Sequence, residues 1–186
     1  MNFRTLLLLI VPVLLIVPVR AAQAADLKSE YALEFAAASG QITALAEAMP
    51  ARTFEWRPGP GVRSVGEVYL HIAETNVLLL GYVGVRVDFP GPRFSGRESG
   101  GEIIARNLAF EKTVHGKDAI VALLNRSLDA VKTSLQVADL EKPVDLFGRK
   151  STTRAVYLRI LAHANEHMGQ SIAYARMNGI VPPWSR

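Results

Sequence analysis

Two histidines, His163 and His167, stand four residues apart in a stretch whose composition is typical of a helix. Residues at positions i and i+4 lie one above the other on the same face of a helix. Two neutral imidazole nitrogens are therefore presented where one divalent metal ion can reach both. The chain has only four histidines, so the placement of two of them at this spacing is informative. A pair alone also occurs as packed or surface residues that bind nothing.

A catalytic zinc site usually takes three protein ligands and leaves a fourth position open. Of the two remaining histidines, His71 falls in an apolar segment predicted to be a buried helix, and His115 falls in a loop beside Gly116 and Lys117. A lone histidine on an apolar helix is more often a packed core residue than a ligand. A facing helix, however, can bring His71 opposite the pair. We therefore predict His71 as the third ligand and His115 as an exposed residue.

The segment 163–167 also matches the H-x-x-E-H pattern of inverzincin proteases, in which Glu166 would be the general base. Those enzymes need another ligand well downstream, and only 19 residues follow His167. On a helix, Glu166 also points about 100° away from His167, toward a charged flank. The protease interpretation is therefore weaker than a site completed by His71, and a solvated or arginine-paired carboxylate is the preferred role for Glu166.

Four long helices are predicted to position these residues. Periodicity, capping residues and helix breakers place them at residues 26–49, 64–83, 118–136 and 151–178. The second opens with the S-x-x-E capping box of Ser64 and Glu67 and is apolar nearly all round, which is typical of a buried helix. Residues 84–100 form a long connection, a short helix is predicted near 102–110, and residues 143–150 are predicted to be a loop. The fold class is all-α, a four-helix bundle with a long crossover between its second and third helices.

The first 24 residues are expected to lie outside this bundle. Arg4 gives a positive start, residues 6–19 form an apolar run, and Ala22-Gln23-Ala24 is an A-x-A cleavage pattern. Together these features indicate a secretory signal peptide at residues 1–24. Residues 25–186 then form one domain that is periplasmic or secreted. The apolar run is short for a membrane-spanning helix, and an uncleaved N-terminal anchor is the alternative.

Charge and cysteine content exclude several classes of function. Removing the signal peptide removes two arginines and no acid, so the formal net charge falls from +4 to +2. No long basic run remains, and neither nucleic acid nor, after cleavage, a membrane is an expected partner. The chain has no cysteine, which excludes disulfides, a thiolate nucleophile and cysteine-based zinc sites. An exported chain without thiols suits an oxidising compartment.

Several short motifs accompany these histidines along the chain. They are Trp56-Arg57-Pro58, Arg63-Ser64-Val65-Gly66-Glu67, His71, His163, Glu166-His167-Met168-Gly169-Gln170, Tyr174, Arg176, Gly179 and Pro182-Pro183. Together they resemble the DinB-like family, also called the DinB/YfiT-like metalloproteins. The resemblance covers nearly the whole mature chain, and its motifs are individually loose but jointly specific.

The resemblance implies a four-helix bundle of up-down-down-up type. It also implies that His71, His163 and His167 bind a divalent metal, commonly zinc, nickel or manganese, and that homodimers are common. Characterised relatives include transferases and isomerases that use low-molecular-weight thiols. These relatives work in the reducing cytoplasm, so the export signal of this chain argues against a thiol cofactor.

We expect an exported metal-dependent enzyme of transferase or hydrolase type with a small-molecule substrate, in which the metal acts as a Lewis acid. The alternative is a non-catalytic protein that binds a small ligand or acts under stress, with a structural or absent metal. Three clear ligands favour the open coordination position of a catalytic site. Glu67 and Glu74, which flank His71 on its helix, are candidate partners of its imidazole, although an ordinary polar role is the preferred interpretation of both.

Overall fold

The computed structural model describes residues 26–94 and 98–185, and the predicted signal peptide at residues 1–24 lies outside them. The elements are α1 (Leu27–Ala48), α2 (Val65–Tyr82), α3 (Gly100–Glu111), α4 (Lys117–Val137), β1 (Pro143–Leu146), β2 (Arg149–Thr152) and α5 (Thr153–Met177), with short 3-10 helices at Ala51–Thr53 and Pro183–Ser185. Of the helices described, none combines the length and the apolar character needed to span a bilayer.

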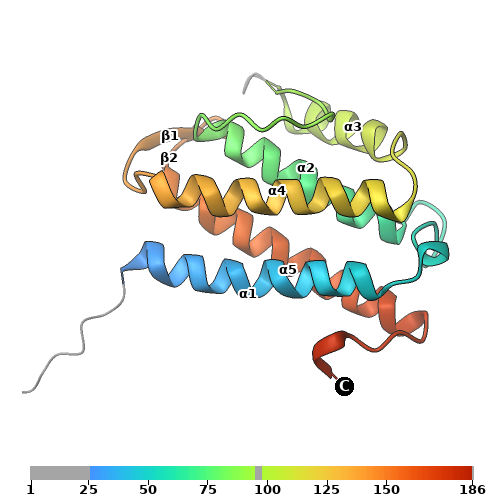
Figure 1. Cartoon of the computed structure of the whole chain (residues 1–186). Helices are drawn as coiled ribbons and strands as arrows, with labels where there is room; N and C mark the ends of the chain where they lie inside the picture. Colours follow the sequence, from blue (N-terminus) through green and yellow to red (C-terminus); the bar gives the residue numbers. More distant parts are fainter. Residues whose placement is uncertain (1–25, 95–97, 186) are drawn as a thin grey trace, which may run out of the picture.

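Four of the helices form a bundle in up-down-down-up order (Figure 1). α1 and α5 run in one direction, and α2 and α4 run in the other. Because α2 and α4 are parallel, the chain must return along the bundle between them, and this crossover contains α3. α2 packs against α4 and α5, and α1 packs against the same two helices. The predicted helical bundle with a long crossover is confirmed.

Capping interactions fix where the bundle helices begin and end. The Ser64 hydroxyl accepts a hydrogen bond from the Glu67 N–H at 3.2 Å, and the Glu67 carboxylate accepts one from the Ser64 N–H at 2.7 Å. This is the capping box that the sequence predicts at the start of α2. α5 ends just before Gly179, whose φ of 72° is a left-handed conformation that glycine adopts readily.

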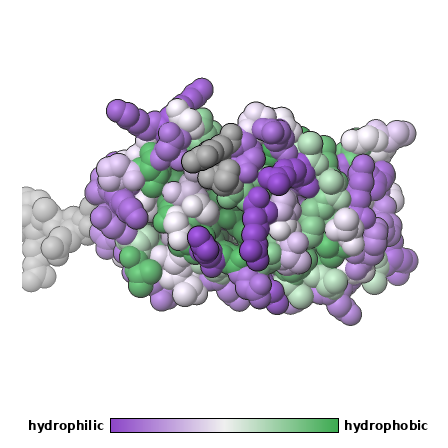
Figure 2. All heavy atoms as spheres, turned by 90° about the horizontal axis from the view of Figure 1, so that it is seen from above, coloured by the Kyte–Doolittle hydropathy of each residue, from purple (hydrophilic) through white to green (hydrophobic). Residues whose placement is uncertain are grey.

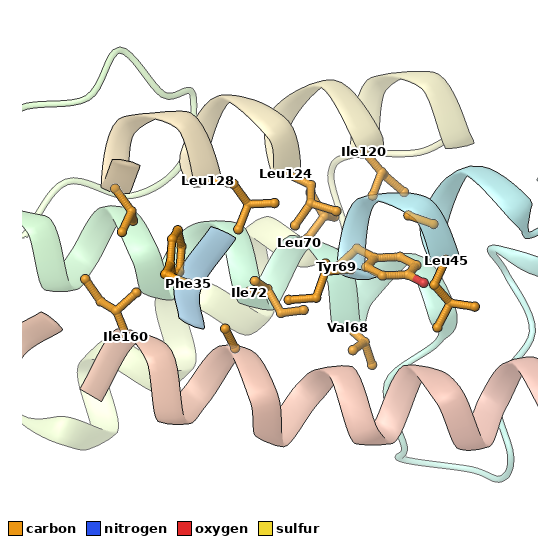
Figure 3. Close-up of a cluster of buried hydrophobic side chains, with 14 of the residues drawn as sticks. Phe35, Leu45, Val68, Tyr69, Leu70, Ile72, Ile120, Leu124, Leu128 and Ile160 are labelled. Carbon is orange, nitrogen blue, oxygen red and sulfur yellow. The ribbon is translucent and has the colours of Figure 1, made fainter. Parts of the chain in front are cut away.

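The hydrophobic core lies between the four bundle helices, and α2 is its central element (Figure 3). Twelve of the 18 residues of α2 are buried, which explains why its sequence is apolar nearly all round. α4 contributes Ile120, Leu124 and Leu128 to the same core. Leu128, which the helical spacing places in the core, is 1% exposed. The core thus fixes α2 between α4 and α5, the position from which His71 can face α5.

The predicted loop at residues 143–150 is wrong, because this segment is a β-hairpin. β1 and β2 pair antiparallel, with Leu146 opposite Arg149. The turn residues Phe147 and Gly148 have φ values of 54° and 77°, and a type I′ turn requires positive φ at both. The Asp145 carboxylate accepts a hydrogen bond from the Gly148 N–H at 2.7 Å. Such turns are usually recognised by an Asn-Gly sequence. Here the turn is Phe147-Gly148, and phenylalanine rarely takes this conformation, so the sequence did not indicate a hairpin.

Helix α3 lies on the outside of the bundle and buries a single stripe against it. The stripe consists of Ile103, Asn107 and Glu111, which are spaced four residues apart. Figure 2 views the molecule from this side, where hydrophilic side chains project between apolar patches. The last residue of the stripe, Glu111, is a carboxylate that is 2% exposed. The docking of α3 on α2 therefore carries an acidic group into the interior of the protein.

Candidate metal centre

Three histidines from two helices converge at one point inside the bundle. Nε2 of His71, on α2, lies 3.2 Å from Nε2 of His163, on α5. The ring centroids of these two histidines and His167 are 4.4, 4.7 and 4.9 Å apart. One nitrogen from each of the three rings lies within 4.8 Å of the others. The structure therefore brings together the three histidines that the sequence analysis selected, and we refer to them as the histidine triad.

The fourth histidine is not part of this cluster. The His115 side chain is 70% exposed, and its ring Nδ1 is 3.9 Å from the carboxylate of Glu55, which is also exposed. Glu166 is exposed as well, although it directly precedes His167. The positions of His115 and Glu166 agree with the exposed roles expected for both.

The three histidines of the triad differ in their exposure to solvent. His163 is 5% exposed, whereas His71 and His167 are half-buried. Burial, with the neighbouring rings of His167 and His71, lowers the pKa of His163 to about 2. Burial is also the main cause that lowers the pKa of His167. At neutral pH both imidazoles are therefore uncharged, which is the state that a metal ion requires of a histidine ligand.

A chain of hydrogen bonds along α5 fixes the ring of His167. Its Nδ1 lies 2.8 Å from Oε1 of Gln170. Since a carbonyl oxygen only accepts, Nδ1 carries the proton and donates it. Gln170 Nε2 then donates to the Tyr174 hydroxyl at 2.9 Å. The rings of Tyr174 and Trp56 pack in a T-shaped arrangement, with their centroids 5.4 Å apart. This tautomer leaves the lone pair of His167 on Nε2, where a ligand can use it.

Glu111 approaches the triad from α3. Its Oε2 accepts a hydrogen bond from Nε of Arg63 at 2.7 Å. Its Oε1 lies 3.3 Å from Nδ1 of His71, but the two atoms are not aligned as a hydrogen bond. Burial alone would raise the pKa of Glu111, yet His71 and Arg63 together outweigh it and hold the pKa below its usual value. Glu111 is therefore an ionised, buried carboxylate beside a triad histidine.

Glu111 is not among the site residues predicted from the sequence, because the predicted short helix ends one residue before it. Its only signal is the spacing of Ile103, Asn107 and Glu111, which share one face of α3. Spacing shows that these residues lie together but not that the face docks on α2 at the level of His71.

The two glutamates that flank His71 on α2 have different roles. Glu67 forms the capping box and an ion pair with Arg57 at 3.0 Å, so the ordinary polar role preferred for it is what the structure shows. Glu74 is instead 2% exposed, and neither of its carboxylate oxygens has a hydrogen-bond partner among the residues that the structure describes. Burial and the nearby Glu111 raise its pKa to about 9. The ordinary polar role preferred for Glu74 is therefore wrong, because helix α3 covers a position that would otherwise face solvent.

Comparison with known proteins gives the same architecture. The sequence model of the DinB superfamily matches residues 34–171. A crystal structure of a DinB-like protein from Bacillus cereus is similar with a TM-score of 0.62 and 17% identity, covering 83% of this chain and 95% of that one. A DinB-like protein from Bacillus subtilis is similar with a TM-score of 0.58 and 18% identity, covering 84% and 98%. At these identities the likeness to the two structures shows a shared fold. No curated protein matches the chain.

Proposed function

Because this chain belongs to the DinB superfamily, we propose that it binds a divalent metal ion through His71, His163 and His167. We further propose that it is a metal-dependent enzyme of transferase or hydrolase type that acts on a small molecule. The observation that supports this proposal is the convergence of three imidazoles from two helices, with two Nε2 atoms 3.2 Å apart. Zinc, nickel and manganese are the candidate ions.

The chemistry of the triad fits such an ion. Imidazole nitrogen is a ligand that suits zinc and nickel. A tetrahedral ion with metal–nitrogen distances of about 2.0–2.1 Å holds its ligand nitrogens roughly 3.3 Å apart, close to the distance between His71 and His163. The lowered pKa values of His163 and His167 keep both rings free of a competing proton at neutral pH.

The surrounding residues determine how such a centre would work. A divalent ion held there would supply Lewis acidity, which polarises an oxygen or nitrogen atom of the substrate. Three protein ligands leave a coordination position open. His71 and His167 are half-buried and His163 is buried, so substrate would approach from the side of the first two. Gln170 holds the ring of His167 in one orientation, so the site need not rearrange to bind.

We assign this activity to the periplasm or the exterior of the cell. The support is the signal-peptide pattern of residues 1–24 and the absence of cysteine from the chain. A low-molecular-weight thiol is therefore not part of the proposed reaction. Assembly as a homodimer stays a prediction.

Metal content tests the proposal directly. Protein purified without a histidine tag, stripped with a chelator and titrated with zinc, nickel and manganese should bind at least one ion tightly per chain. His163→Ala should weaken this binding more than roughly 100-fold, beyond the effect of losing an outer partner, because it removes a ligand. His115→Ala is the matched control and should bind like the wild type. Equal binding by His163→Ala and the wild type would rule out the triad.

A screen of hydrolase and transferase substrates tests the catalytic part separately. The metal-loaded wild type should turn over at least one substrate class, and His163→Ala should not. Turnover that is identical in the metal-free protein would contradict a role for the ion in the reaction. Tight binding without turnover in the screen would favour the alternative, a non-catalytic binding protein.

A further inference from the structure

Four buried polar atoms without a hydrogen-bond partner gather behind the histidine triad. They are Nδ1 of His71, Oε1 of Glu111 and both carboxylate oxygens of Glu74. They make up half of the eight such side-chain atoms in the part of the chain that the structure describes. Leaving a buried donor or acceptor unpaired is costly, and native proteins contain few such groups. Nδ1 of His71 and Oε1 of Glu111 face each other at 3.3 Å, whereas nothing among the described residues pairs with the two oxygens of Glu74.

We propose that Nδ1 of His71 and the carboxylates of Glu74 and Glu111 form a second divalent-cation site that adjoins the histidine triad. One ligand atom from each of the three residues lies within 4.8 Å of the others. The imidazole of His71 has its Nε2 beside His163 and its Nδ1 beside Glu111. The two edges of one ring thus face two different sets of ligands.

The charges of the cluster favour a cation. Glu74 and Glu111 are each 2% exposed, so solvent compensates neither carboxylate. Arg63 supplies one positive charge, and it does so at Oε2 of Glu111, away from the unpartnered oxygen. Glu74 and Glu111 lie close enough for their negative charges to oppose each other. Burying two such carboxylates together is expensive, and a bound cation lowers this cost.

The two ligand sets select different ions. Three imidazoles suit zinc and nickel, whereas carboxylate oxygens suit harder ions such as manganese. The second site has two carboxylates and one imidazole, and we expect it to prefer Mn²⁺ to a degree that the triad does not.

Glu111 also borders a cavity outside the triad. This cavity, of about 300 Å³, lies between the start of α2 and the connection from α3 to α4. Its lining is charged, with Glu55, Glu67, Arg57 and Lys112, and none of the triad histidines borders it.

The test uses the mature chain loaded with one Zn²⁺ and then titrated with Mn²⁺, with free Mn²⁺ measured by its electron paramagnetic resonance signal. The wild type should take up one Mn²⁺ per chain and keep its Zn²⁺. Glu74→Gln should keep its Zn²⁺ and leave the added Mn²⁺ free. Glu166→Gln, which changes an exposed glutamate beside His167, should behave like the wild type in both respects.

The outcomes separate the second site from the triad. A wild type that binds Zn²⁺ but no Mn²⁺, or a Glu74→Gln variant that still binds Mn²⁺, overturns the second site and leaves the triad standing. A wild type that binds neither ion overturns both. If Glu74→Gln does not fold, Glu74→Asp replaces it, because it keeps the charge and shortens the reach. Mn²⁺ bound as tightly by folded Glu74→Asp as by the wild type also overturns the proposal.

Discussion

The Nε2 atoms of His71 and His163 lie 3.2 Å apart, although 92 residues separate the two histidines in the chain. Helical spacing explains how His163 and His167 share a face of α5. Packing alone explains His71, because α2 must lie against α5 in one rotation and one register. The triad therefore forms only in the folded bundle. Metal binding at the triad and the stability of the fold are linked for this reason.

In the metal-free protein, the buried neutral ring of His163 should lower stability as the pH falls below about 6.5. The pKa of His163 is about 2 in the folded state and ordinary in the unfolded state, so between these values the unfolded chain binds the proton and the folded one does not. The free energy of unfolding then decreases with falling pH by up to about 1.4 kcal/mol per pH unit for this group. Urea unfolding between about pH 5 and pH 7 with a chelator present measures this slope.

His163→Gln should remove this contribution and so lower the slope of the free energy of unfolding against pH, because glutamine binds no proton in this range. Glu74 acts in the opposite direction, since its pKa is raised to about 9 and the folded state holds its proton where the unfolded state does not. Its contribution is present in both proteins and cancels in the comparison. The exposed His115→Gln is the control and should keep the wild-type slope. An unchanged slope in His163→Gln would contradict the buried, neutral histidine.

Replacing Gln170 by Ala should weaken metal binding at the triad by about 10–100-fold, because it removes the acceptor that holds the proton of His167 on Nδ1. The metal-free variant should unfold at nearly the wild-type urea concentration. Asn165→Ala is the control on the same helix, because within the described residues this exposed amide donates its hydrogen bond to the backbone of Leu161 and not to the triad. Isothermal titration with Zn²⁺ compares the three proteins, and an affinity of Gln170→Ala equal to that of Asn165→Ala would count against the relay.

Leu128→Ala should destabilise the protein by about 2–5 kcal/mol, because it opens a cavity at a residue that is 1% exposed in the core. Leu158→Ala is the matched control, since Leu158 is 47% exposed on α5 and its truncation leaves no cavity. Chemical denaturation measures both variants. A cost for Leu128→Ala no larger than that for Leu158→Ala would remove Leu128 from the core.

The exported protein should begin at Ala25, after cleavage of residues 1–24. N-terminal sequencing of protein recovered from the periplasm or the medium checks this. Replacing Ala22 and Ala24 with bulky residues should block processing, because small side chains are required at the cleavage site. An intact Met1 on protein embedded in the membrane would favour the uncleaved anchor instead.

Much of the fold could be predicted from local signals. The capping box at Ser64, the periodic apolar residues of α4 and the Gly179 stop after α5 each act within a few residues, so sequence alone reveals them. The hairpin at residues 143–152 could not, because its turn places Phe147 in a conformation that phenylalanine rarely adopts. A propensity-based prediction does not anticipate this conformation, in which the ring centroid of Phe147 lies 5.0 Å from that of Tyr82.

The candidate site likewise contains residues that could be predicted from the sequence and residues that could not. His163 and His167 follow from spacing on one helix, and His71 followed from its place in an apolar segment. Glu111 and the burial of Glu74 depend on how α3 docks on α2. That docking is a long-range contact between two helices with a long connection, and hydrophobic periodicity does not specify its register. The positions of Glu74 and Glu111 beside the triad therefore could not be predicted from the sequence.

The separation of His71 and His163 in the chain has a consequence for a protein with no cysteine. An ion bound by both would tie α2 to α5 and close a loop of 92 residues, as a disulfide does elsewhere. In the chain-entropy description, a cross-link of that span stabilises the folded state by about 4–5 kcal/mol. Unlike a disulfide, this tie would form without oxidation, and a chelator would reverse it.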